Sequence, residues 1–170
     1  MVGKGDLMAK FQFEGVDKLV EQYQKLDKNT EQVIGKAIYN GAGVVMKECK
    51  AAVNNIHTDD SHGYGTIGNP KTGPTSIQKA GLIHSLGIAK MRNDNGFYNV
   101  KIGFDGYNYV KTKRWPQGQP NMMVARSIES GTSWMQKQPF MRKAEQSSRS
   151  KCEKAMSETV DREIQKIIGD

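Results

Sequence analysis

Residues 121–144, NMMVARSIESGTSWMQKQPFMRKA, decide the fold, and their first part predicts a short helix that stops at a glycine. Asn121 suits an N-cap position because its side-chain oxygen can accept a hydrogen bond from an unpaired backbone N–H of the first turn. Three apolar residues then share one helical face: Val124, Ala125 and Ile128. Gly131 follows, and a glycine readily takes the left-handed conformation that ends a helix. We therefore expect a helix that begins beside Asn121 and ends at Gly131.

A second helix is predicted directly after an irregular loop. Pro139 suits the first helical position, where its missing N–H is no loss, and Phe140 follows as an apolar anchor. The two helices would meet at a sharp angle through residues 131–140, a segment that we call the corner. Its expected anchors are Gly131, Pro139 and Phe140. Three charged residues of the two helices would lie close to the corner: Arg126, Glu129 and Arg142.

The same stretch resembles the signature of a known family. It is similar to the pattern E-x-G-T … Q-P-F-[ML]-R-x-A of phage tail-component proteins, the tail-completion or head–tail joining family of long-tailed phages. The matching residues are Ala125, Glu129, Gly131, Thr132, Gln138, Pro139, Phe140, Met141, Arg142 and Ala144. Family members usually carry a second proline just before the last alanine, where this chain has Lys143. Upstream, the family tends to have T-G-x-L-x-x-S, and residues 80–85 are AGLIHS, with alanine in place of threonine.

The resemblance implies a structural protein of the virion and not an enzyme. Proteins of this family form rings, typically sixfold, that join the head connector to the tail tube, and they assemble in the cytoplasm of the host bacterium. The implied partners are further copies of the chain, the head-connector protein and the tail-terminator or tail-tube proteins, with no cofactor and no membrane. The expected subunit or partner interface lies around the corner: Arg126, Glu129, Thr132, Met135 and Arg142.

The composition bounds the class of protein. The chain has 170 residues, which suits one domain, but only 36% of them are hydrophobic, so surface is left for partners. The net charge of +7 favours nucleic acid or acidic proteins as neighbours, or solubility alone. Cys49 and Cys152 match no metal or disulfide spacing, which fits a reducing compartment. The N-terminal stretch lacks the apolar core of a signal peptide, and no apolar run reaches the roughly 20 residues of a membrane span.

We predict an α+β fold in a single domain, with a small antiparallel sheet packed by two N-terminal helices and a long C-terminal helix. The N-terminal helices would cover residues 17–26 and 31–56, separated by the polar residues Asp27–Thr30. Three glycines in the second helix would be tolerated where another backbone approaches closely: Gly35, Gly41 and Gly43. The sheet would be a hairpin of residues 86–92 and 97–104, because Asn93–Gly96 is a strong turn signal. The last helix would run from Pro139 to Ile168.

Residues 57–76, HTDDSHGYGTIGNPKTGPTS, form the most irregular stretch of the chain. Such a composition buries little apolar surface, so we predict a loop that is mobile in the free subunit and ordered by a neighbour. Four of its residues are of types that bind divalent metals: His57, Asp59, Asp60 and His62. Their spacing matches no defined metal motif, so a polar loop is the favoured interpretation and a metal-dependent hydrolase is the weaker alternative.

A basic and aromatic run, YNYVKTKRW, occupies residues 107–115. Lys111, Lys113 and Arg114 could contact phosphates while bases stack on the neighbouring rings, so a stand-alone nucleic-acid-binding protein is the main alternative function. Given the resemblance, we favour a loop that faces a partner or the DNA channel and contacts DNA weakly. Four methionines gather near the corner and would adapt to an uneven partner surface or fill the core: Met122, Met123, Met135 and Met141.

Overall fold

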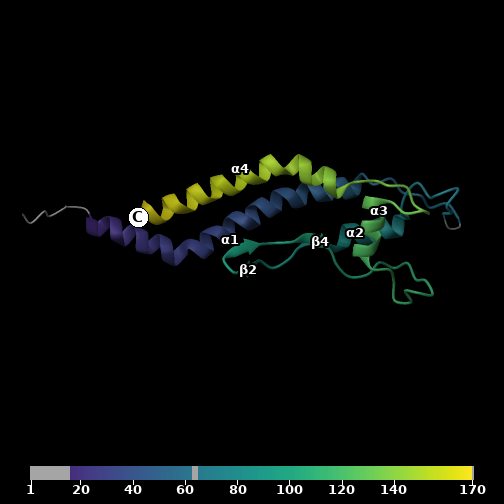
Figure 1. The fold of residues 1–170 in the computed structure, drawn as a ribbon, viewed down its shortest axis with the longest axis horizontal. Helices are drawn as coiled ribbons and strands as arrows, with labels where there is room; N and C mark the ends of the chain where they lie inside the picture. The colour runs from purple at the N-terminus through teal and green to yellow at the C-terminus, as the bar shows by residue number, and fades with distance from the viewer. Residues whose placement is uncertain (1–15, 63–64, 170) are drawn as a thin grey trace, which may run out of the picture.

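The computed structural model describes residues 16–62 and 65–169, which form an elongated molecule (Figure 1). Its helices and strands, in chain order, are α1 (Val16–Asn54), α2 (Ser76–Ser85), β1 (Leu86–Ile88), β2 (Arg92–Asp94), β3 (Phe97–Asn99), β4 (Ile102–Phe104), α3 (Asn121–Ser130) and α4 (Met141–Ile168). Helices and antiparallel strands are segregated along the chain, so the predicted α+β class is confirmed.

The first helix is continuous, and the predicted break into two N-terminal helices is wrong. Helix α1 runs for 39 residues and lies antiparallel against α4 along its length (Figure 1). The expected break at Asp27–Thr30 is helical because its polar side chains are satisfied within the helix. Asn29 Nδ2 donates to the carbonyl of Lys25 at 2.7 Å, and Thr30 Oγ1 donates to that of Leu26 at 2.8 Å.

Close approach of α1 to α4 is confirmed at one of the three helical glycines. A Cβ on Gly41 would lie 2.6 Å from Met156 Cγ and 2.9 Å from Cys152 Sγ, so a larger residue would push the helices apart. Gly35 makes only an ordinary contact with Met91, and a Cβ on Gly43 would meet no described atom within 4 Å. The prediction of tight packing is thus correct at Gly41, where the side chains of Cys152 and Met156, and not the backbone of α4, fill the space over the glycine.

The C-terminal half of helix α4 buries two polar side chains. Thr159 and Glu163 are 1% and 7% exposed. The Glu163 carboxylate accepts hydrogen bonds from Lys166 Nζ at 2.8 Å and Lys36 Nζ at 2.6 Å. These contacts, led by the Lys166 hydrogen bond, lower the pKa of Glu163 from 4.5 to about 2. A charge cluster therefore joins α1 to α4 beside the buried apolar residues Val33 and Ala37 of α1.

The predicted hairpin is present as two short ladders. Strands β1 and β4 pair antiparallel, and β2 pairs with β3 in the same way. Asn95 and Gly96 form the turn with φ values of 54° and 90°, the positive values that a two-residue hairpin turn of type I′ requires. The β1–β4 ladder is partly buried, whereas every residue of β2 is exposed. The outer half of the hairpin therefore contributes little to the core.

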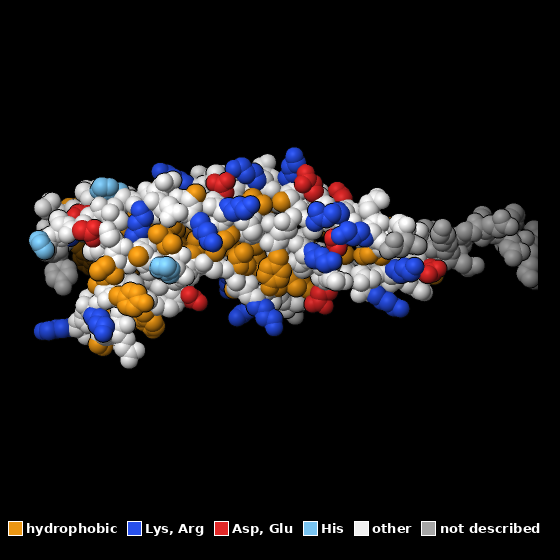
Figure 2. All heavy atoms as spheres, turned by 180° about the vertical axis from the view of Figure 1, so that it is seen from behind, with side chains coloured by type: hydrophobic (Ala, Val, Ile, Leu, Met, Phe, Trp, Pro, Cys, Tyr) orange, Lys and Arg blue, Asp and Glu red, His pale blue; other side chains and the backbone are white. Residues whose placement is uncertain are grey.

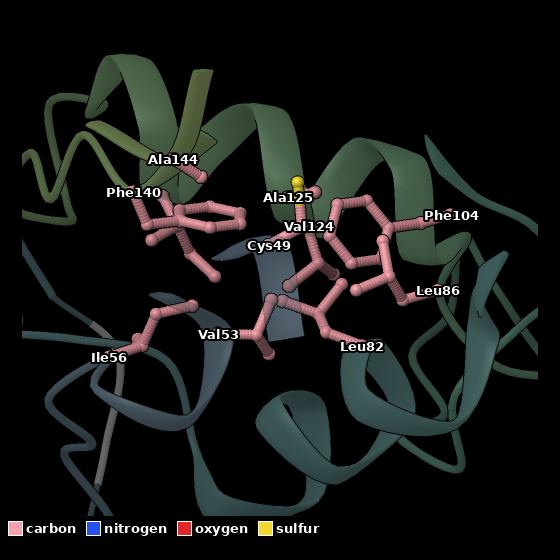
Figure 3. Close-up of a cluster of buried hydrophobic side chains, with 11 residues drawn as sticks. Cys49, Val53, Ile56, Leu82, Leu86, Phe104, Val124, Ala125, Phe140 and Ala144 are labelled. Atoms are coloured by element: carbon pink, nitrogen blue, oxygen red, sulfur yellow. The ribbon is translucent and has the colours of Figure 1, made fainter. Parts of the chain in front are cut away.

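The hydrophobic core lies at one end of the molecule, where α2, α3, the inner ladder and the start of α4 meet the end of α1 (Figure 3). The Phe140 ring is 5% exposed and tilts against Phe104, with ring centroids 6.0 Å apart. Phe140 is therefore the buried anchor that the sequence predicted. The other core residues are Cys49, Val53, Ile56, Leu82, Leu86, Val124, Ala125, Ile128 and Ala144.

Truncation of Phe140 tests this core. We expect Phe140→Ala to lower the free energy of unfolding by about 3–5 kcal/mol, because it removes a buried ring and leaves a cavity. Tyr23→Ala is the matched control, since Tyr23 is 65% exposed. Chemical denaturation measures both variants, and equal stabilities for the two would contradict the buried position of Phe140.

The ion cluster of Glu163 predicts a pH-dependent stability. A carboxyl whose pKa is lowered on folding stabilises the protein above its ordinary pKa, and that contribution is lost as the pH falls through the folded value. We expect Glu163→Gln to have a lower melting temperature than wild type at pH 7. This difference in melting temperature should disappear as the pH falls from 4.5 to about 2. Glu158→Gln, which alters an exposed pair with Lys154, should melt close to wild type at pH 7. If the melting temperature of Glu163→Gln stayed below that of wild type by the same amount down to the lowest pH, the stabilising role of the Glu163 carboxylate would be contradicted.

Candidate functional site

Helix α3 leads into the corner, and the first residue of α3 does not act as predicted. Pro120, not Asn121, is the N-cap, and its carbonyl accepts the amides of Met123 and Val124. Asn121 is 2% exposed, and its Nδ2 donates to the Asp105 carbonyl at 2.9 Å. The Asn121 side chain therefore ties the preceding loop to α3 and does not cap the helix.

Gly131 ends α3, as predicted, in a conformation that favours glycine. Its φ is 73° and its ψ is 167°, so φ is positive but the backbone is extended and not in the left-handed helical region. A Cβ there would also lie 3.0 Å from Lys137 Cβ. Both the backbone angle and the close approach favour glycine at this turn of the corner.

The carboxylate of Glu129, near the end of α3, caps the start of α4. It accepts hydrogen bonds from the backbone amides of Met141 at 2.8 Å and Arg142 at 3.1 Å. Helix α4 begins at Met141 with Phe140 as N-cap, so the prediction of Pro139 as the first helical residue is wrong. The cap fixes that start, because a negative group satisfies two of the unpaired N–H groups at the positive end of the helix.

Gln138 connects the corner to the loop of residues 57–76. Its backbone amide donates to the Ile128 carbonyl at 2.8 Å. Its side-chain Nε2 donates to the carbonyls of His57 at 3.0 Å and Thr72 at 2.9 Å, and its Oε1 accepts the His57 amide at 2.9 Å. One amide side chain therefore joins segments that lie 81 residues apart in the chain.

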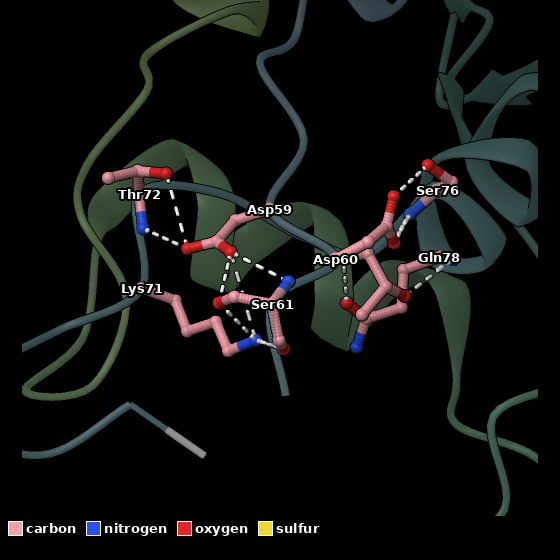
Figure 4. Close-up of polar contacts among 8 residues, drawn as sticks. Asp59, Asp60, Ser61, Lys71, Thr72, Ser76 and Gln78 are labelled. Carbon is pink, nitrogen blue, oxygen red and sulfur yellow. Dashed lines mark hydrogen bonds and ion pairs between the residues drawn. The ribbon is translucent and has the colours of Figure 1, made fainter. Parts of the chain in front are cut away.

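Two adjacent aspartates hold the loop itself (Figure 4). Asp59 accepts the amides of Ser61 at 3.1 Å and Thr72 at 3.0 Å, and Asp60 accepts the amide of Ser76, the first residue of α2, at 2.7 Å. Hydrogen bonds, chiefly from the Ser61 and Ser76 hydroxyls, hold the pKa values of Asp59 and Asp60 below their usual range. Both carboxylates are thus engaged by the loop itself. Mobility of this loop in the free subunit stays a prediction.

The proposed metal ligands do not converge in the part of the chain that the structure describes. No group of three His, Cys, Asp or Glu side chains there is placed to hold a metal ion. His57 and His62 are exposed, whereas the neighbouring Asp59 and Asp60 carboxylates take hydrogen bonds from the loop. Cys49 of α1 is buried, and burial raises the pKa of its thiol.

The five residues expected at an interface have different contacts in the structure. Glu129 caps α4, while Thr132 and Met135 exchange backbone hydrogen bonds of 2.9 and 3.3 Å within the corner. Met135 also packs against the core. Of the five residues, only Arg126 and Arg142 have exposed side chains, although the Arg142 amide also donates to Glu129. The interface assigned to all five residues stays a prediction.

The basic loop between β4 and α3 forms a separate lobe at the lower left of Figure 2. Lys111, Lys113 and Arg114 are exposed, and the Arg114 guanidinium lies over the Trp115 ring, 5.6 Å from its centroid. Tyr109 is 87% exposed. Cations beside exposed rings can contact a phosphate backbone or the surface of an acidic protein.

No protein-family model, curated protein or solved structure matches this chain. None of the helices in the described ranges is long and apolar enough to cross a membrane. The geometry of the corner and of the basic loop therefore carries the functional argument, together with the motif resemblance.

Removal of the Gln138 side chain should loosen the loop of residues 57–76. Gln138→Ala deletes three hydrogen bonds to the loop backbone and leaves the amide of Gln138 itself in place. We expect faster cleavage in this loop during limited proteolysis, located by mass spectrometry. Gln136→Ala is the matched control, because Gln136 meets the loop through its backbone amide alone, at Lys71. Equal cleavage rates for the two variants would show that Gln138 does not hold the loop.

Proposed function

We propose that this chain is a structural virion protein of the head–tail junction of a long-tailed phage or prophage. It would form a ring that joins the head connector to the tail tube, and it would catalyse no reaction. The observation that carries the proposal is the corner. Residues of the family signature, Glu129, Gly131, Gln138 and Phe140, form one connected unit that sets the angle between α3 and α4 and fastens the long loop.

The distribution of exposed apolar side chains supports an assembly role. Ile67, Phe97 and Tyr109 are 86%, 79% and 87% exposed, and they lie on three separate segments of the chain. Figure 2 shows hydrophobic side chains over the middle of the molecule as well as on the basic lobe. A subunit of a ring between two other rings needs contact surfaces in several directions, and exposed apolar groups mark such surfaces.

The proposed partners follow from this position in the particle. The chain would contact further copies of itself within the ring, the head-connector protein on one side and the tail-terminator or tail-tube proteins on the other. The exposed arginines Arg126 and Arg142 and the basic lobe would face these partners or the DNA channel.

Electron microscopy tests the proposal. Negative-stain images of the purified chain should show closed rings, and labelling of assembled particles should place the chain at the neck. A chain that stays monomeric at every concentration and is missing from the neck of the particle would overturn the proposal. Enzyme activity assays are less decisive because they test one alternative at a time.

A nucleic-acid-binding protein is the second candidate, favoured by the cation and aromatic side chains of the basic lobe. If the lobe only flanks passing DNA, it should bind DNA weakly, without sequence preference. With three phosphate contacts, a plot of the logarithm of the DNA-binding constant against the logarithm of the salt concentration should have a slope of about −3. We expect the triple variant Lys111→Ala, Lys113→Ala, Arg114→Ala to keep its fold and its rings and to lose most of this salt dependence. Tight, sequence-selective binding by the wild-type subunit at physiological salt would favour the nucleic-acid-binding alternative instead.

A further inference from the structure

The sequence contains two Asn-Gly pairs, Asn40-Gly41 and Asn95-Gly96. An asparagine before a glycine is the pair most prone to lose its side-chain amide without an enzyme, because the backbone nitrogen of the glycine can attack the asparagine side-chain carbon Cγ. A glycine has no Cβ to obstruct this approach or to restrict the backbone angles that it needs. Whether either pair reacts therefore depends on how tightly the fold holds it.

The fold holds the first pair rigidly. Gly41 is buried under the side chains of α4, and it lies in the interior of α1, where backbone amides are paired along the helix. The Asn40 side chain is also engaged, because its Nδ2 donates to Thr159 Oγ1 at 2.7 Å and to the Ala155 carbonyl at 3.4 Å. Attack on Asn40 would therefore require α1 to unwind and to separate from α4 at this point.

The second pair lies at the end of the outer hairpin, in residues 93–97, which we call the hairpin tip. Asn95 and Gly96 are both exposed and form the two-residue turn between β2 and β3. Every residue of β2 is exposed, and Phe97 is 79% exposed. A two-stranded ladder that buries so little surface is marginal in water, so the hairpin tip opens far more easily than α1.

One hydrogen bond restrains the reacting nitrogen while the turn is closed. The Gly96 amide donates to Asn93 Oδ1 at 2.8 Å, so the nitrogen keeps the proton that it must lose in order to act as a nucleophile. The base of the hairpin is held separately, because the Met91 amide donates to the Tyr39 hydroxyl of α1 at 2.9 Å. The hairpin tip can therefore open while the base stays on α1.

We propose that Asn95 is a site of spontaneous deamidation and that Asn93 sets its rate. When the hairpin tip opens, the Gly96 nitrogen loses its proton and bonds to Asn95 Cγ, and the side-chain nitrogen leaves as ammonia. Water then adds to either carbonyl of the resulting succinimide ring, and the bond from that carbonyl to the Gly96 nitrogen breaks. Aspartate or isoaspartate is left at position 95. The whole reaction consumes one water, releases one ammonia and needs no other reactant.

Either product changes the hairpin tip. Both add a negative charge to the turn, next to Asp94. Isoaspartate also routes the backbone through the former side chain and so adds one methylene group to the turn. A two-residue turn fixes the register of its strands, so the longer turn should displace the pairing of Asp94 with Phe97.

Incubation of the full-length protein at mildly alkaline pH tests the proposal. Peptide mass spectrometry measures the conversion of amide to acid at both pairs, and an isoaspartate-specific methyltransferase detects the second product. In the folded protein, Asn95 should convert while Asn40 stays intact. In the chain unfolded in urea, the two asparagines should convert at similar rates, because the fold then holds neither. Equal rates at the two pairs in the folded protein, or no conversion of Asn95 while the unfolded chain converts, would overturn the proposal.

Two substitutions of Asn93 test its control of the rate. Asn93→Ala removes the acceptor of the Gly96 amide, and the loss of one such hydrogen bond should raise the rate at Asn95 about fivefold. Asn93→Asp is the matched control, because a carboxylate keeps an oxygen that can accept this amide, and its rate should stay close to that of wild type. Both variants change an exposed side chain, so circular dichroism should show wild-type folding. Deamidation of Asn93→Ala at the wild-type rate would overturn the role of Asn93.

Discussion

The carboxylate of Glu129 on the first amides of α4 is the interaction on which the rest of the structure depends. It connects the end of one helix to the start of the next and so sets their relative position. With that start fixed, Phe140 enters the core against Phe104, and α4 runs back along α1. Gln138, in the same corner, fastens the distant loop at His57 and Thr72. A short polar motif therefore organises both ends of a long chain.

The fold relies on polar contacts because few of its residues are hydrophobic. Only 36% of the residues are hydrophobic, and the main cluster of buried residues lies at one end of the molecule. Away from that cluster, the long helices are joined by the close approach at Gly41 and by the charge cluster of Glu163. The surface left over includes the hairpin tip, the basic lobe and a groove between the end of α1 and the start of α4. In the proposed role, these surfaces would serve neighbours in the particle.

Sequence reasoning identified the features that depend on local pattern. The hairpin turn at Asn95-Gly96, the burial of Phe140, the close approach at Gly41 and the stop at Gly131 were all predictable from residue type and spacing. The errors have a common cause. The break expected at Asp27–Thr30 and the helix start expected at Pro139 were inferred from the local preferences of those residue types. In the structure, α1 continues through the expected break, and the cap from Glu129 fixes the start of α4 at Met141.

The contacts that sequence reasoning missed join residues far apart in the chain. Gln138 bonds to His57 across 81 residues, and no local pattern indicates such a pair. The groove is likewise hidden, because its floor combines Ile56 after α1 with Phe140 before α4. The signature did mark Glu129 and Gln138, but Glu129 was expected at an interface and not as a helix cap, and Gln138 was given no role. Their roles became apparent only from the geometry of the corner.

Hydrogen exchange at the start of α4 tests the central claim most directly. Amides at a helix N-terminus lack an intrahelical partner and exchange quickly unless another group accepts their hydrogen bonds. We predict that the amides of Met141 and Arg142 exchange slowly in the wild-type protein, measured residue by residue by nuclear magnetic resonance. In Glu129→Ala this protection should be lost while the Ala144 amide, bonded to the Phe140 carbonyl, stays protected. Fast exchange of Met141 and Arg142 in wild type, or equal protection in Glu129→Ala, would contradict the role assigned to Glu129.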